Sequence, residues 1–436
     1  MVTRILDHKI MEALKDIAGD AGQKISRPSF HPFPARLPLS VAESLLRNIS
    51  APDAIILDPM AGSGTTIVAA KKLGREALGF DLDPLALLIA RCAVHDHDTV
   101  SLQELKIRIL DRAKSLAISN EAEFSLQKLF QQEEAGFIRF WYPESSQIQL
   151  SALAEAICEE PAGPNRSFAW VVFSSLIVAK SAGASFALDI SRSRPHKRDI
   201  KPIILPFIGW ERRFNAAIKN VPFSGMPSAV HCGVSRADAR ALPVQNDSVD
   251  LILTSPPYLN AIDYMRAHKF SLIWMGYPLH VLRNIRGTMI GSERGLWQMN
   301  GIPDKLERNI EEAPIEKRRR ALIRHYLSDL HRVLLEMHRV LRTDGIAILV
   351  LGPTIISPGG NDAVRVVTEI GRPIGLELIG STSRTLNPMR RSLPFPATLV
   401  GSPLAARMRE EVIAAFRKNS EQCPKSIGIR RYTKGS

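Results

Sequence analysis

The segment 58–66, Asp-Pro-Met-Ala-Gly-Ser-Gly-Thr-Thr, has residue types and a spacing suited to binding a small ligand. Its two glycines let a ligand approach the backbone at positions where a Cβ would interfere. The leading acid disfavours a phosphate, and no Lys-Ser/Thr pair follows the glycines, so this is not a phosphate-binding P-loop. A cationic or neutral nucleoside cofactor fits better. The expected ligand contacts are Asp58, Pro59, Gly62, Ser63, Gly64, Thr65 and Thr66.

A second segment, Ser255-Pro256-Pro257-Tyr258, combines carbonyl acceptors with an aromatic ring. Its two prolines fix φ and remove two N–H donors, so the backbone is stiff and cannot continue a central strand. The carbonyls of Ser255 and Pro256 are then left as acceptors beside the ring of Tyr258. Acceptors next to a stacking face suit a planar base that carries an amino group. A Pro-Pro turn with a packing Tyr is the alternative.

Apolar runs predict that both segments follow buried strands. Residues 54–57 lead into the glycines, and residues 249–254 lead into the prolines. Ligands of open α/β sheets bind at the carboxyl ends of the strands, so we expect the two segments to meet at one edge. A further strand, 77–80, ends at Asp81, about 20 positions after the glycine turn, where an acid binds ribose hydroxyls. Asp83 is expected to cap the next helix.

These motifs resemble those of the amino-methylating DNA methyltransferases, which use S-adenosyl-L-methionine to methylate cytosine N4 or adenine N6. The family's cofactor motif is Asp-Pro-Phe-x-Gly-Ser-Gly-Thr-Thr, in which Met60 replaces the Phe here, and its catalytic motif is Asp/Asn/Ser-Pro-Pro-Tyr/Phe. The segment 31–38, His-Pro-Phe-Pro-Ala-Arg-Leu-Pro, is similar to the family's cofactor-pocket motif. That similarity implies cofactor contacts from His31, Phe33 and Pro34.

The resemblance covers roughly residues 25–400. It implies an α/β fold of the Rossmann-like class I methyltransferase type, with a mostly parallel seven-stranded sheet and a largely helical insertion. It also favours Asp81 for the ribose and implies that Asp238 binds the adenine amino group of the cofactor. Pairing of Asp238 with Arg236 or Arg240 is the alternative.

The resemblance assigns catalysis to Ser255, Pro256, Pro257 and Tyr258. Methyl transfer from a sulfonium needs alignment more than acid–base help. Acceptors on the amine hydrogens, the Ser255 side chain and the Pro256 carbonyl, expose the nitrogen lone pair, while Tyr258 stacks on a base flipped out of the duplex. The Ser-Pro-Pro-Tyr version is most typical of the cytosine-N4 enzymes. Cys232 lacks the Pro-Cys context of cytosine-C5 enzymes, which argues against that activity.

The 436 residues carry 57 Lys and Arg against 44 Asp and Glu, and the net charge of +13 favours a polyanionic partner. With the resemblance, it predicts double-stranded DNA as the partner and leaves open an accompanying restriction endonuclease. Four scattered cysteines without a Cys-x-x-Cys pair predict no metal site and no disulfide framework. Neither a run of ~20 apolar residues nor a signal-peptide pattern is seen, so we expect a cytoplasmic protein.

Basic residues cluster along the chain, and each cluster is a candidate for DNA phosphate contacts. The candidates are Arg192, Arg194, Lys197, Arg198, Arg283, Arg286, Arg294, Arg390 and Arg391. The run 317–320, Lys-Arg-Arg-Arg, is read instead as a solvated helix face, with a specific contact as the alternative.

The chain is expected to divide into five parts. These are an N-terminal helix or tail (1–30), the cofactor-binding first half (31–98), a mostly helical insertion acting as lid or target-recognition element (99–226), the catalytic second half (227–405) and a basic tail (406–436). Residues 276–320 are expected to form a loop region that DNA orders. Residues from about 373 to 400 are expected to supply the antiparallel strand pair that closes the sheet.

Three other functions compete with cytosine-N4 methylation. An adenine-N6 enzyme shares both motifs. An RNA guanosine-N2 methyltransferase usually carries Asp-Pro-Pro-Tyr and an N-terminal RNA-binding module, whereas only about 25 residues precede the first motif here. A non-catalytic nucleic-acid-binding protein with a degenerate methyltransferase fold is disfavoured because both motifs are intact.

Overall fold

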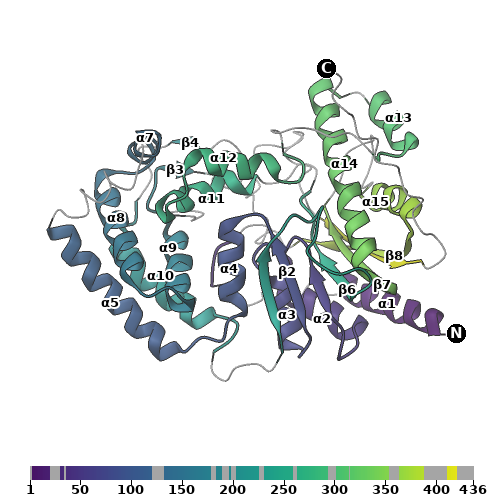
Figure 1. The fold of residues 1–436 in the computed structure, drawn as a ribbon, viewed down its shortest axis with the longest axis horizontal. Coiled ribbons are helices and arrows are strands. Elements are labelled where there is room, and N and C mark those ends of the chain that lie inside the picture. Colours follow the sequence, from purple (N-terminus) through teal and green to yellow (C-terminus); the bar gives the residue numbers. More distant parts are fainter. Residues whose placement is uncertain are drawn as a thin grey trace, which may run out of the picture.

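A computed structural model describes most of the chain (Figure 1). The described residues are 2–19, 30–33, 36–119, 132–177, 183–188, 196–197, 203–224, 230–258, 263–292, 301–313, 315–352, 363–386 and 410–419. Within these ranges, no helix is long and apolar enough to cross a membrane.

The centre of the fold is a seven-stranded sheet with the order β5-β2-β1-β6-β7-β9-β8. The strands are β1 (Ile56–Asp58), β2 (Ala77–Asp81), β5 (Cys232–Arg236), β6 (Val249–Thr254), β7 (Leu341–Leu351), β8 (Leu376–Thr385) and β9 (Glu410–Lys418). The first five in spatial order are parallel, and β9 runs antiparallel between β7 and β8. This mostly parallel sheet with helices on both faces confirms the predicted Rossmann-like fold.

Alternate residues of the central strands supply two separate cores, because each strand is buried on both faces. On β6, Leu251 and Leu253 belong to one core and Ile252 to the other. The first core includes α1 (Val2–Gly19), α2 (Leu39–Ile49), α3 (Thr65–Lys72) and α4 (Pro84–Val94). The second includes α13 (Asp304–Glu312), α14 (Lys317–Val340), α15 (Ala363–Gly371) and the 3-10 helix η2 (Arg372–Ile374).

The segment between β2 and β5 contains the largely helical insertion. Its elements after α4 are α5 (Thr99–Ile118), α7 (Gln132–Trp141), α8 (Glu144–Glu159), α9 (Pro164–Ile177), the short strands β3 (Ala187–Leu188) and β4 (His196–Lys197), and α10 (Pro206–Asn220). These helices form a block beside α4, on the left of Figure 1, and α9 contacts both α4 and α11 (Tyr264–Leu272). The insertion therefore packs against the element that follows the catalytic loop.

The structure corrects the expectation of a loop over residues 276–320. The 3-10 helix η1 (Ile273–Met275) is followed by α12 (Leu279–Thr288), and α13 comes before α14. α13 buries Leu306 and Ile310, four positions apart, so one narrow apolar face packs this strongly polar helix against the core.

The antiparallel strand pair exists, but its second strand lies outside the expected segment of about 373–400. β8 falls within that segment, whereas β9 (Glu410–Lys418) falls in the part expected to be a tail. The sequence of β9, Glu-Glu-Val-Ile-Ala-Ala-Phe-Arg-Lys, has no strand-like alternation because the strand is buried on both faces between β7 and β8.

Candidate active site

The turn after β1 holds two glycines in a backbone conformation that other residues rarely adopt. Gly62 has a φ of 51°, and Gly64, the N-cap of α3, has a φ of 80°. A Cβ on Gly62 would lie 3.5 Å from the ring of Phe33, but a Cβ on Gly64 would lie 2.9 Å from the Cβ of Ala90 on α4. Gly62 therefore shapes the turn, and Gly64 lets α3 pack closely against α4.

Asp81, at the end of β2, holds this turn with its side chain. Its Oδ2 accepts a hydrogen bond from the backbone N–H of Gly62 at 2.8 Å, and its Oδ1 accepts one from that of Asp83 at 2.9 Å. Burial raises the pKa of Asp81 to about 6, and the charge of Asp83 adds to the shift. Each carboxylate oxygen has two lone pairs, so both can still accept a hydrogen bond from a ligand hydroxyl.

Asp58 ties the end of β1 to the end of β6. Its Oδ1 accepts hydrogen bonds from the hydroxyl of Thr254 at 2.7 Å and the backbone N–H of Met60 at 3.2 Å. Burial raises the pKa of Asp58 to about 6 despite these hydrogen bonds. A second link joins the two segments, since the Thr66 hydroxyl donates to the carbonyl of Leu253 at 3.1 Å. The glycine turn and the strand that leads to the second motif are thus fixed to each other.

Aromatic rings form one wall beside the turn. Phe33 and Tyr264 stack with ring centroids 5.6 Å apart and an interplanar angle of 16°. Tyr264 opens α11, which also carries the fully buried His268. The Nδ1 of His268 lies 2.5 Å from the Oδ2 of Asp83, and Asp83 caps α4, as expected for that residue. The buried pair of His268 and Asp83 therefore fixes α11, which carries Tyr264, to the beginning of α4.

His31 and Pro34 were the other predicted contacts from the segment 31–38. His31 lies outside the pocket lining, and its Nε2 is 2.8 Å from the Oγ of Ser174 on α9. Burial lowers the pKa of His31 well below its usual range, so the ring is neutral near pH 7. His31 thus links this segment to the insertion. Pro34 lies outside the described residues.

The loop after β6 presents the second motif. The Oγ of Ser255 donates to the carbonyl of Val350 at 3.3 Å and lies 3.4 Å from the hydroxyl of Tyr258. The Tyr258 hydroxyl donates to the Oε1 of Glu411 at 3.2 Å. A serine hydroxyl that donates to a carbonyl keeps lone pairs for accepting a hydrogen bond from an amine.

Asp238, just after β5, pairs with Arg240, as the alternative interpretation expects, and its contact with the cofactor stays a prediction. It lines the pocket, and it accepts hydrogen bonds from the Nε and Nη2 of Arg240 at 2.9 and 2.7 Å. Burial disfavours the charged form of Asp238, but the bonds from Arg240 outweigh burial and lower its pKa. Arg240 also donates to Asp329 of α14 at 2.6 Å and to the carbonyl of Thr288 at 2.5 Å. The pocket is thereby connected to α12 and α14.

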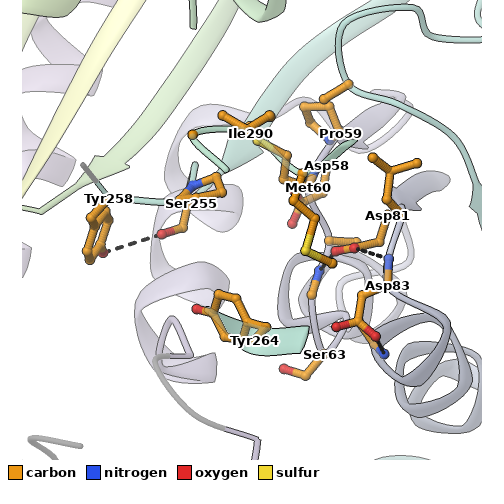
Figure 2. Close-up of a pocket in the computed structure, with 18 of the residues that line it drawn as sticks. Asp58, Pro59, Met60, Ser63, Asp81, Asp83, Ser255, Tyr258, Tyr264 and Ile290 are labelled. Atoms are coloured by element: carbon orange, nitrogen blue, oxygen red, sulfur yellow. Dashed lines mark hydrogen bonds between the residues drawn. The ribbon is translucent and has the colours of Figure 1, made fainter. Parts of the chain in front are cut away.

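Both motifs line a single pocket of about 450 Å³ at the carboxyl edge of the sheet, a size typical of small-molecule sites. Figure 2 shows Asp58 and Asp81 on one side and Ser255 and Tyr258 on the other, with Tyr264 between them. The predicted residues that line the pocket are Phe33, Asp58, Pro59, Gly62, Ser63, Thr65, Thr66, Asp81, Asp238, Ser255, Pro257 and Tyr258, together with Arg286 of the predicted DNA contacts. Gly64 and the buried Pro256 lie outside the lining.

Much of the remaining lining was not predicted from the sequence. It comes from the segment after α12 and from α14, namely Met289, Ile290, Gly291, Ser292, Leu322 and Tyr326. Asp263 also lines the pocket and forms ion pairs with Arg266 at 2.9 Å and Arg286 at 2.6 Å. Helical periodicity marks Tyr326 as a packed residue, but no local pattern shows that residues 289–292 line the same pocket as the glycine turn.

Three of the predicted DNA contacts lie among the described residues. Arg283 pairs through both terminal nitrogens with Glu133, and Arg286 pairs with Asp263. Lys197 is exposed, with its Nζ 5.0 Å from the ring centroid of Phe140. The candidates outside the described residues are Arg192, Arg194, Arg198, Arg294, Arg390 and Arg391. In the part of the chain that the structure covers, no group of three His, Cys, Asp or Glu side chains is placed to hold a metal ion.

Comparison with known proteins finds a family model that matches part of the chain. Residues 12–91 match the model of the N6/N4 methyltransferase family, described as DNA methylase. The type II methyltransferase M.MjaII of Methanocaldococcus jannaschii is 20% identical over 454 residues, which cover 83% of this chain and 78% of the relative. M.MvaI of Kocuria varians is 20% identical over 421 residues, which cover 88% and 89%.

A solved structure also aligns with the chain. The TehB-like SAM-dependent methyltransferase of Corynebacterium glutamicum has 12% identity and a TM-score of 0.28, with 95% of this chain and 98% of that chain covered. The fold assignment rests on the strand order described above. The family match and the type II methyltransferase relatives support the assignment of this chain to the N6/N4 amino-methyltransferase family, whose methyl donor is S-adenosyl-L-methionine.

Proposed function

We propose that this protein transfers a methyl group from S-adenosyl-L-methionine to an exocyclic amino group of a DNA base, with cytosine N4 as the preferred acceptor. One observation carries the proposal: the glycine turn and the Ser-Pro-Pro-Tyr loop, almost two hundred positions apart, line the same cavity. The preference for cytosine N4 rests on serine at the first position of the catalytic motif.

The glycine-turn side of the cavity fits S-adenosyl-L-methionine. The buried Asp58 and the partly buried Asp81 offer negative charge to a ligand with a sulfonium and an ammonium group. Asp81 also keeps lone pairs that can accept hydrogen bonds from ligand hydroxyls such as those of a ribose. Phe33 and Met60 add apolar surface for the purine ring. When bound, the cofactor supplies the electrophilic methyl group.

The catalytic loop acts on the amine. The Oγ of Ser255 accepts a hydrogen bond from one amine hydrogen, and we assign the second acceptor to the backbone carbonyl of Pro256. Two acceptors draw the nitrogen out of conjugation with its ring and expose its lone pair. Tyr258 stacks on the flipped base and offsets part of the unstacking energy. The proton released after transfer passes to water.

The DNA backbone is expected to contact the beginning of α14. Lys317, Arg318 and Arg319 are exposed there, whereas Arg320 and Arg324 pair with glutamates of α13. Leu322, only about 7.5 Å along the helix axis from Lys317, already lines the pocket. Figure 1 shows α14 and α13 extending beyond the sheet at the top of the view. We therefore favour the specific contact over the solvated face for this run.

The test is transfer of a labelled methyl group to DNA by the wild type, Ser255→Ala and the control Ser115→Ala on the exposed face of α5. Ser255→Ala should lower the transfer rate by about 100-fold or more, because an acceptor that acts in the transition state is lost. Cofactor affinity should stay within about twofold, since Ser255 binds the amine. Equal rates for wild type and Ser255→Ala would remove Ser255 from the mechanism, and transfer to RNA alone would favour the guanosine-N2 alternative.

A further inference from the structure

Glu411 is a buried carboxylate behind the catalytic loop. It lies on β9, 153 positions from Tyr258, and its residue is 8% exposed. Its Oε1 accepts the hydrogen bond from the Tyr258 hydroxyl, and its Oε2 accepts from the Nη2 and Nε of Arg384 at 2.7 and 3.2 Å. Arg384 stands directly opposite Glu411 in the β8–β9 ladder. Each carboxylate oxygen therefore has a separate partner.

We infer that Glu411 is a positioning residue, which acts through the Tyr258 hydroxyl to fix the ring on which the target base stacks. The inference rests on the proposed function. A buried carboxylate is strongly unfavourable unless it is paired and hydrogen-bonded. Arg384 supplies the opposite charge at Oε2 and leaves Oε1 to receive the tyrosine. The antiparallel strands β8 and β9 thereby supply two residues, Arg384 and Glu411, that support the catalytic loop although they are distant from it in sequence.

Two further contacts restrict Tyr258. Gly352 follows β7, and a Cβ at that position would collide with the Tyr258 ring, so the ring packs directly on backbone. The Oγ of Ser255 lies 3.4 Å from the Tyr258 hydroxyl, as the dashed line in Figure 2 shows. Burial and the charge of Glu411 raise the pKa of Tyr258 well above its usual range, so its hydroxyl keeps the proton that it donates. With the hydroxyl and one flank held, the ring is ordered before the base arrives, which favours productive alignment.

A double-mutant cycle on single-turnover methyl transfer tests this role, with Glu411→Ala, Tyr258→Phe, the double variant and Glu411→Gln. Glu411→Ala should slow transfer about 10- to 100-fold, the range for a hydrogen bond to a charged group. In the Tyr258→Phe background the same change should have less than about twofold effect, because the hydroxyl that links the two residues is gone. Glu411→Gln keeps an acceptor and should lose less than about fivefold.

Two controls separate positioning from general damage. Affinity for S-adenosyl-L-methionine should stay within about twofold in every variant, because the cofactor side of the pocket is untouched. Glu410→Ala, on the exposed neighbour in β9, should leave the rate unchanged. Equal rate losses from Glu411→Ala with and without the Tyr258 hydroxyl would overturn the inference alone. A wild type that binds the cofactor and methylates no nucleic acid would overturn the proposed function and the inference with it.

Discussion

The carboxylate of Asp81 stabilises the glycine turn, and we expect the same carboxylate to bind the cofactor. Asp81→Ala removes the acceptor of two backbone N–H groups, so the free energy of unfolding should fall by about 1–3 kcal/mol. Affinity for S-adenosyl-L-methionine should fall about 10- to 100-fold, because a charged hydrogen-bond partner is lost. Urea denaturation and titration calorimetry measure the two effects. Asp98→Ala, which removes an exposed helix cap on α5, should lower stability and leave the affinity unchanged; an unaltered affinity in Asp81→Ala would contradict the assigned role.

Two acids with raised pKa values, Asp58 and Asp81, should make cofactor binding depend on pH. Burial raises the pKa of Asp58 and of Asp81 from 3.8 to about 6, so the folded protein holds these protons more tightly than the unfolded chain. The contribution of the two acids to stability is therefore present below about pH 4 and is lost as the pH rises towards about 6. A cationic ligand favours the ionised acids, so its affinity should rise about tenfold or more from about pH 5 to about pH 7. Calorimetry at the two pH values decides, and a constant affinity would contradict this coupling.

Contiguous motifs predicted the residues of the glycine turn and of the Ser-Pro-Pro-Tyr loop that line the pocket, because each motif carries its chemistry in a few adjacent positions. Glu411 was not predicted, since its partner Tyr258 is distant in sequence and nothing local marks this carboxylate. Arg283 and Arg286 show the opposite case. They belong to a basic cluster in sequence, yet each pairs with an acid, and local composition does not reveal a distant partner.

Close packing of α3 on α4 depends on Gly64. Gly64→Ala places a Cβ 2.9 Å from Ala90 and also strains a backbone with φ of 80°, so it should lower the free energy of unfolding by about 2–4 kcal/mol. Gly74→Ala is a matched control, because Gly74 has a φ of 70° but a Cβ there would meet nothing within 4 Å. It should cost only the backbone strain, about 1–2 kcal/mol. Urea denaturation measures both, and equal losses would argue against the helix–helix contact.

Apolar runs predicted β1, β2 and β6, but the weakly apolar helix α13 was not predicted. α13 is held by two buried residues and by ion pairs from Glu307 and Glu311 to Arg324, so its order comes from tertiary contact. β9 was not predicted as a strand for a related reason. Its Ala-Ala-Phe centre has no strand periodicity, and only the neighbouring β7 and β8 make it a strand.

The mostly parallel, seven-stranded sheet was predictable from the resemblance to the amino-methylating DNA methyltransferases, apart from the position of β9. The position of the insertion was not, since its packing against α4 and α11 depends on surfaces that no local pattern describes. That the insertion acts as a lid or target-recognition element, and that the beginning of α14 contacts the DNA backbone, both stay predictions.

The α14 tip gives a prediction about DNA affinity. Replacing Lys317, Arg318 and Arg319 together by Gln should lower the slope of log affinity against log salt by up to about three, because up to three phosphate contacts are lost. Fluorescence anisotropy over a range of salt concentrations measures the slope. Gln at Arg320 and Arg324, which pair with α13, is the comparison and should change the slope less. An unchanged slope in the triple variant would place the backbone contacts elsewhere.

Nucleoside mass spectrometry of DNA from cells that express the protein tests most directly whether the two motifs build one methylating site. N4-methylcytosine should appear with the wild type and be absent with Ser255→Ala at equal protein level. N6-methyladenine in its place would keep the site and change the base. Equal levels of methylated base with both proteins, or no methylated base with the wild type, would contradict a single pocket that holds a methyl donor and a flipped base.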